Sequence, residues 1–119
     1  MIAGRTLAGW LARADELGAE GRYFEAHEEL ELAWKAASGD EKILLQGLIQ
    51  LAAGLHRLKL SPEKTDGAFY LLDRGLEKLA ASAALLTPES RSALETTISG
   101  IRAAGTAPSS FRFGLRPAS

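Results

Sequence analysis

The chain has 119 residues, of which 46% are hydrophobic, and its 14 basic and 15 acidic residues give a formal net charge of -1. This length suits one compact domain. The basic residues are spread along the chain, so we expect no nucleic-acid binding. The absence of cysteine excludes disulfides, thiolate metal sites and cysteine nucleophiles. No segment has the apolar run of a signal peptide or a membrane span, so we expect a cytoplasmic protein without membrane association.

Apolar spacing predicts a first helix from about Gly4 to Leu17, which ends at Gly18. A second helix is predicted from about Tyr23 to Ala37. The sequence "SGD" follows it, where Gly39 suits a left-handed cap and Asp40 can cap the next helix. The connection is short, so these two helices should be antiparallel neighbours.

The third predicted helix, from Glu41 to Leu60, is apolar on almost every side. Only a narrow stripe is less apolar, and it consists of Gln46, Gln50, Ala53 and Arg57. A helix of this kind is typical of the centre of a bundle. Gly47 and Gly54 should permit close packing against a neighbouring helix.

Two similar sequences predict the remaining helix starts. "SPEK" at Ser61 should begin the fourth helix, and "TPES" at Thr87 should begin a fifth helix from Pro88 to about Ala103. The fold class is therefore all-α, with about five helices in a compact single-domain bundle. A tetratricopeptide solenoid is a minor alternative, although no period of about 34 residues recurs.

The C-terminal segment differs from the rest of the chain. Phe111, Phe113 and Leu115 alternate with polar or small residues, which predicts an extended segment with one apolar edge. We expect a bundle domain over residues 1–104 and an extended tail over 105–119, pinned to the bundle or to a second chain. The apolar tail and the apolar third helix make a homodimer plausible.

The second helix carries the most informative polar pattern. At 100° per residue, one face holds an aromatic and polar column of Phe24, His27, Glu31 and Trp34. Glu25 and Glu29 should lie on the opposite side in solvent, with Glu28 between. Gln46 and Gln50 need hydrogen-bond partners, and we expect these from His27, Glu31 or Arg22. We also expect His27 to contact Gln46, Gln50 or His56.

The segments "GRYFEAHEELELAW", "LLQGLIQLAAGLHRL" and "GAFYLLDRGLEKL" resemble the domain-of-unknown-function family numbered 309, over about residues 21–79. This resemblance implies a small all-helical bacterial or archaeal protein, and the family has no established activity. Matched position by position, the resemblance singles out Glu25, His27, Glu28, Glu31, Trp34, Gln46, Gly47, Gln50 and His56.

These residues permit several interpretations. The first is a pocket for a small molecule, with ligand-binding residues Phe24, Trp34, Gln46, Gln50 and His56, or for a metal ion, with ligands His27, Glu31 and His56. The second is a non-catalytic interaction or dimerisation module in which the polar cluster fixes helix register. The third is a metal-dependent or acid/base hydrolase with His27, Glu31 and Glu28 as catalytic residues. The cofactor and the ligand are not identified by the sequence.

Overall fold

The computed structural model describes residues 6–118, and in this part of the chain all named elements are helical. This confirms the predicted all-α class. The helices are α1 (Leu7–Ala19), α2 (Tyr23–Ala36), α3 (Gly39–Leu60), α4 (Asp66–Ala81) and α5 (Pro88–Ala104), with one 3-10 turn at Ala83–Leu85. None of the described helices is long and apolar enough to cross a membrane.

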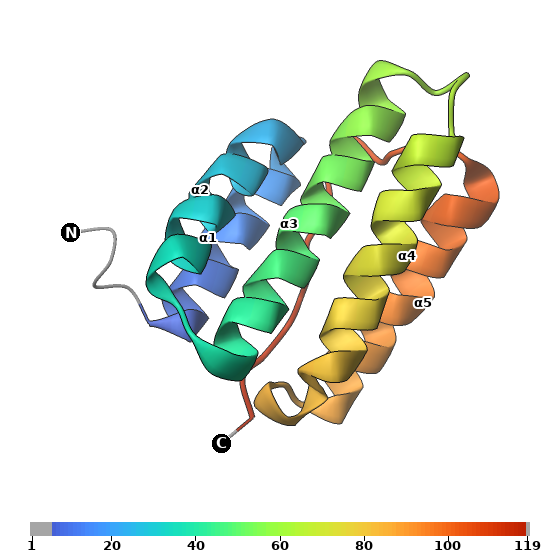
Figure 1. Ribbon diagram of the computed structural model, residues 1–119. Coiled ribbons are helices and arrows are strands. Elements are labelled where there is room, and N and C mark those ends of the chain that lie inside the picture. Colours follow the sequence, from blue (N-terminus) through green and yellow to red (C-terminus); the bar gives the residue numbers. More distant parts are fainter. Residues whose placement is uncertain (1–5, 119) are drawn as a thin grey trace.

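Each helix packs against the next helix in the chain. Figure 1 shows α3 in the middle, with α1 and α2 on one side and α4 and α5 on the other. Leu44, Leu48, Leu51 and Leu55 of α3 have no exposed surface. The central position predicted from the apolar sequence of α3 is therefore confirmed, because only a helix with neighbours on several sides buries so much of its surface.

The partly exposed surface of α3 follows the predicted stripe. Gln46, Gln50 and Ala53 are partly exposed and Arg57 is exposed. Ile49 is also only partly buried. This face of α3 lies between α2 and α4 and forms the floor of the surface described below.

Glycine allows α3 and α4 to approach closely. A Cβ atom on Gly47 would lie 2.8 Å from the Cβ of Lys78 and 3.0 Å from the carbonyl oxygen of Gly75. Such distances are shorter than carbon atoms tolerate, so any side chain at residue 47 would push the helices apart. The predicted packing role of Gly47 is confirmed.

One predicted helix start is wrong. The fourth helix begins at Asp66, not at Ser61. The N–H of Ser61 is still bonded to the carbonyl of Arg57 at 2.9 Å, so Ser61 ends α3. The N–H of Lys64 then bonds to the carbonyl of Ser61 at 3.0 Å and closes a turn. Ser-Pro is compatible with both a helix start and a turn, and here the reversal between two antiparallel helices uses it as a turn.

The start of the fifth helix is confirmed. The Thr87 hydroxyl accepts a hydrogen bond from the N–H of Ser90, and Pro88 occupies the first turn. The first helix begins after Thr6, whose hydroxyl accepts from the N–H of Gly9 at 3.1 Å. The predicted start at Gly4 lies outside the described residues.

The C-terminal tail completes the core. In Figure 1 it runs behind α3 between the two pairs of outer helices. Phe111, Phe113 and Leu115 are buried, and the alternating residues Arg112, Gly114 and Arg116 are exposed. The two phenylalanine rings meet edge to face, with centroids 5.1 Å apart. The predicted extended conformation is confirmed. The apolar side of the tail packs into the core of the same chain.

Candidate functional site

Two pockets lie along the line where α2 and α3 meet, and we refer to them together as the groove; the predicted ligand-binding residue Gln50 lines neither pocket. The indole end is a pocket of about 250 Å³ lined by Glu31, Trp34, Lys35, Gln46 and Ile49. The histidine end is a pocket of about 130 Å³ lined by Phe24, His27, Ala53, His56 and Arg57. The two helices are antiparallel, so successive turns of α2 lie beside turns of α3 in reverse order. The predicted column on α2 therefore forms one wall of the groove.

His27 and Glu31 form the central contact of that wall. The Nε2 of His27 lies 3.0 Å from a carboxylate oxygen of Glu31, as the spacing of four residues predicts. A carboxylate can only accept, so Nε2 must carry the proton in this contact. The Nδ1 atom of His27 is buried and has no hydrogen-bond partner. In the neutral ring Nδ1 presents a lone pair, and in the charged ring it presents an N–H donor.

The structure does not show the predicted hydrogen bonds between His27 and the polar residues of α3. Nε2 bonds to Glu31 and Nδ1 has no partner, so His27 bonds to neither glutamine nor to His56. Arg22 is also engaged elsewhere, with Glu20 and Glu25 at 3.1 Å each. The polar groups of α2 and α3 lie along one groove without satisfying one another.

Phe24 connects the two histidines. Its ring stacks on His27, with centroids 6.1 Å apart, and contacts His56 at 5.3 Å. Both imidazoles therefore pack on one exposed phenyl ring, which is 47% exposed. Among residues 6–118 no three His, Cys, Asp or Glu side chains form a group able to hold a metal ion. The proposed metal set of His27, Glu31 and His56 is not brought together in this arrangement.

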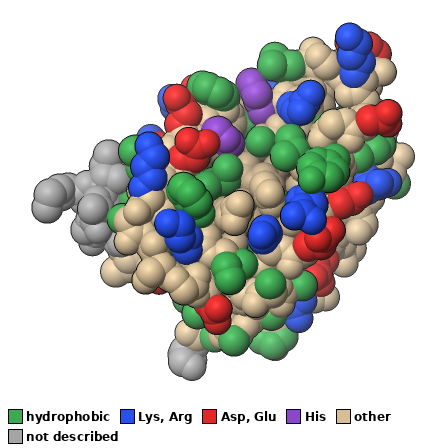
Figure 2. Space-filling model, in the orientation of Figure 1, with side chains coloured by type: hydrophobic (Ala, Val, Ile, Leu, Met, Phe, Trp, Pro, Cys, Tyr) green, Lys and Arg blue, Asp and Glu red, His purple; other side chains and the backbone are tan. Residues whose placement is uncertain are grey.

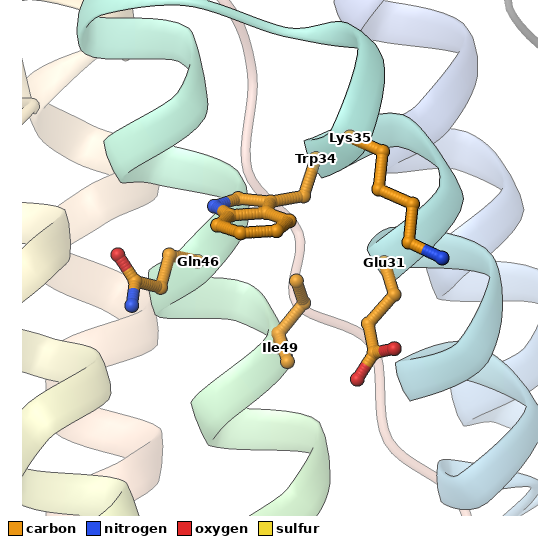
Figure 3. A pocket seen from close by; sticks show the side chains of 5 residues that line it. All are labelled: Glu31, Trp34, Lys35, Gln46 and Ile49. Atoms are coloured by element: carbon orange, nitrogen blue, oxygen red, sulfur yellow. The ribbon is translucent and has the colours of Figure 1, made fainter.

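Trp34 forms the other aromatic part of the wall. Figure 3 shows its indole reaching from α2 toward α3, with Gln46 and Ile49 on the α3 side and Glu31 and Lys35 on the α2 side. The ammonium group of Lys42 lies 4.3 Å from the ring centroid. The indole N–H of Trp34 is buried and has no partner. The Lys42 ammonium group thus lies over one face of the indole, and the indole N–H donates to no acceptor.

Three buried polar atoms in the described chain have no hydrogen-bond partner, and all three belong to the polar set on α2 and α3. They are Nδ1 of His27, Nε1 of Trp34 and Oε1 of Gln50. A buried polar atom without a partner costs about 1–3 kcal/mol. Their concentration here separates this surface from the rest of the fold, whose buried polar side chains are satisfied.

The other carboxylates of α2 lie outside the groove. Glu28 is exposed, so its predicted catalytic role with His27 has no support from a shared contact. Glu25 pairs with Arg22, and that hydrogen bond lowers the pKa of the Glu25 carboxyl. Glu29 was expected in solvent, but it is partly buried and bonds to Arg13 of α1 at 2.9 Å. That expectation was wrong because the angular positions of side chains around α2 do not show where α1 packs.

Arg57, Lys35, Ile49 and Ala53 also line the groove and were not predicted as site residues. Two of them, Arg57 and Ala53, belong to the less apolar stripe of α3, which was the available signal. Both histidines of the chain open onto the face seen in Figure 2, with basic and acidic side chains around them. The groove is therefore a mixed surface in which aromatic, basic and acidic groups meet.

A family model matches residues 11–71, about half of the chain, and its description is "Domain of unknown function (DUF309)". The chain belongs to this family. The match begins within α1 and ends within α4, so it includes every residue of the groove. It does not include α5 or the tail. No curated protein and no solved structure matches the chain.

Proposed function

We propose that this DUF309 protein binds a small molecule in the groove between α2 and α3. The supporting observation is the set of unpartnered polar atoms on His27, Trp34 and Gln50. Ligand sites commonly combine aromatic and apolar walls with a few convergent polar groups. The groove has this composition, with Phe24 and Trp34 as aromatic walls and Ile49 at its floor.

The unpartnered atoms also suggest the kind of ligand. With neutral His27, Nδ1 and the Gln50 oxygen are acceptors, and the Trp34 N–H is a donor. A flat molecule that carries an N–H group and a carbonyl supplies a donor and an acceptor of the kind these atoms lack, and its ring would lie against Phe24 or Trp34. Pockets of about 130 and 250 Å³ suit a ligand smaller than most drug-sized molecules.

Benzamide has this chemistry and can serve as the first probe. The chain has two tryptophans, so an NMR titration can follow the indole N–H of Trp34 with that of the core residue Trp10 as the internal reference. We expect the Trp34 signal to shift and that of Trp10 to stay. Gln50→Leu should weaken binding about tenfold, the loss of one hydrogen bond. A Trp34 signal that does not move would contradict the proposal.

The competing interpretation is a structural one, in which the polar set fixes helix register. It predicts that benzamide leaves the spectrum unchanged and that replacing His27 or Gln50 lowers the melting temperature. A ligand site predicts the opposite pattern, because residues kept for binding are often not optimal for stability.

A further inference from the structure

The histidine end of the groove contains basic groups and no acidic lining residue. Its lining residues are Phe24, His27, Ala53, His56 and Arg57. No carboxylate among residues 6–118 forms an ion pair with His56 or Arg57. Most of the other arginines of the bundle do have such a partner. An arginine and two histidines line one small pocket that has no lining carboxylate, although Glu31 contacts His27 from outside it. This set of basic groups favours an anion.

We infer that this end of the groove receives an oxyanion, either a carboxylate or a phosphate group of the ligand. The inference rests on the proposed function, because it assigns the charge of a molecule bound in the same groove. Arg57 would supply the fixed positive charge, and the planar guanidinium suits both kinds of oxyanion. His27 would supply a hydrogen bond from Nδ1 when its ring is charged.

The Arg57 side chain reaches from α3 to the start of α4. A Cβ atom on Gly67 would lie 2.9 Å from the Cζ atom of Arg57. The guanidinium therefore lies directly over the first turn of α4. Arg57 also lines two further pockets at the connection between α3 and α4, so its charge is reachable from solvent.

The acidic side chains near the histidine end form ion pairs, lie in solvent or line neighbouring pockets. On α2, Glu31 bonds to His27, Glu25 bonds to Arg22, and Glu28 is exposed. Beyond Arg57, the connection to α4 contributes Glu63, Lys64 and Asp66, which share a separate pocket with it. Lys59 and Glu25 share a neighbouring pocket with His56, so charges of both signs lie beside this imidazole. The ammonium group of Lys59 donates to the carbonyl of Gly21 at 2.9 Å.

Proton uptake should accompany oxyanion binding. Glu31 holds the proton of His27 on Nε2, so Nδ1 donates only when the ring carries a second proton. A neutral His27 would instead point a lone pair at the anion. Lower pH therefore favours the bound oxyanion, and protonation of His56 acts in the same direction.

Benzoate and benzamide form a matched pair of probes with the same shape and different charge. We expect NMR titration of the full chain at pH 6 to show about tenfold tighter binding of benzoate, and this advantage should be lost at pH 8. Arg57→Gln should weaken benzoate binding about tenfold and should weaken benzamide binding much less, because benzamide carries no charge. The control Arg91→Gln removes the same charge from α5, far from the groove in the fold, and should change neither.

A third arm uses inorganic phosphate. Shifts of the His27 and His56 ring signals with phosphate alone would assign the site to an oxyanion without a ring, and shifts with benzoate only would assign it to an aryl carboxylate. Equal affinity for benzoate and benzamide, or no effect of Arg57→Gln, would overturn the oxyanion inference and leave groove binding intact. Failure of all three probes would overturn both proposals.

Discussion

The backbone N–H of Phe113 donates to the carboxylate of Asp15 at 2.7 Å, across 98 positions of sequence. The same carboxylate also accepts from the N–H of Gly114 at 3.3 Å. This contact fixes the middle of the tail to α1. At the other end, the N–H of Arg116 donates to the Ser90 hydroxyl at 3.1 Å, and the N–H of Thr87 donates to the Arg116 carbonyl. The tail thereby joins the first and last helices.

Asp15→Ala should destabilise the protein by about 1–3 kcal/mol, because it leaves the partly buried N–H of Phe113 without an acceptor. Asp15→Asn keeps a carbonyl oxygen in place and should lose less. Urea unfolding of the three proteins measures the difference. Equal stability of the wild type and the alanine variant would show that the Asp15 contact with the tail contributes little to stability.

The Asp15 contact should also respond to pH. Burial raises the pKa of the Asp15 carboxyl above its ordinary value of 3.8, against the opposing effect of the hydrogen bonds from Phe113 and Gly114. The folded state thus holds this proton more tightly than the unfolded state. The associated stability is present below pH 3.8 and is lost as the pH rises through the folded pKa.

Asparagine at position 15 has no such proton, so unfolding free energies of the wild type and Asp15→Asn can be compared from pH 3 to pH 7. The unfolding free energy of Asp15→Asn should increase relative to that of the wild type as the pH increases. A shift in favour of the wild type would show that the hydrogen bonds outweigh burial.

Tyr23→Phe should destabilise the fold by about 1 kcal/mol. The buried Tyr23 hydroxyl donates to the carbonyl of Pro108 and holds the start of the tail. Tyr70→Phe is the control, because Tyr70 is 62% exposed and should be neutral. Thermal unfolding of both variants makes the comparison, and equal melting temperatures would argue against a structural role for the Pro108 contact.

Burial raises the pKa of the Tyr23 phenol from 10.0 to about 12. The folded state keeps this proton longer than the unfolded state, so stability should fall as the pH rises from 10 to about 12. The Tyr23→Phe variant should lack this part of the alkaline loss. Unfolding measured over that range checks the sign.

Gly47→Ala should lower stability, although alanine is the better helix former by about 1 kcal/mol. The new methyl group would meet the backbone and a Cβ atom of α4, which cannot move without separating the helices. Gly100→Ala on α5 is the matched control, since a Cβ there has no atom within 4 Å. It should raise stability by up to about 1 kcal/mol. If both variants gain stability, the close approach of α3 and α4 is not a constraint.

Gln50→Leu should leave stability unchanged or raise it by about 1 kcal/mol, because it removes a buried oxygen without a partner. Chemical denaturation checks this. A clear loss of stability would support the register interpretation of the polar set.

Features that depend on residues close together in the chain could be predicted from the sequence. The apolar surface of α3, the cap at Thr87 and the extended tail follow from local periodicity and local hydrogen bonds. The contact of His27 with Glu31 follows for the same reason, since four residues make one turn of a helix. These features needed no knowledge of the neighbouring helices.

How the helices and the tail face one another depends on tertiary packing. Glu29, which was expected in solvent, forms an ion pair with Arg13 because α1 packs beside α2. Arg57 joins the histidines because the antiparallel arrangement brings the end of α3 beside the start of α2. The glutamines of α3 lie near polar side chains of α2 but form no hydrogen bond with His27. A hydrogen bond between two helices depends on distances and orientations that cannot be read from the spacing of residues in the sequence.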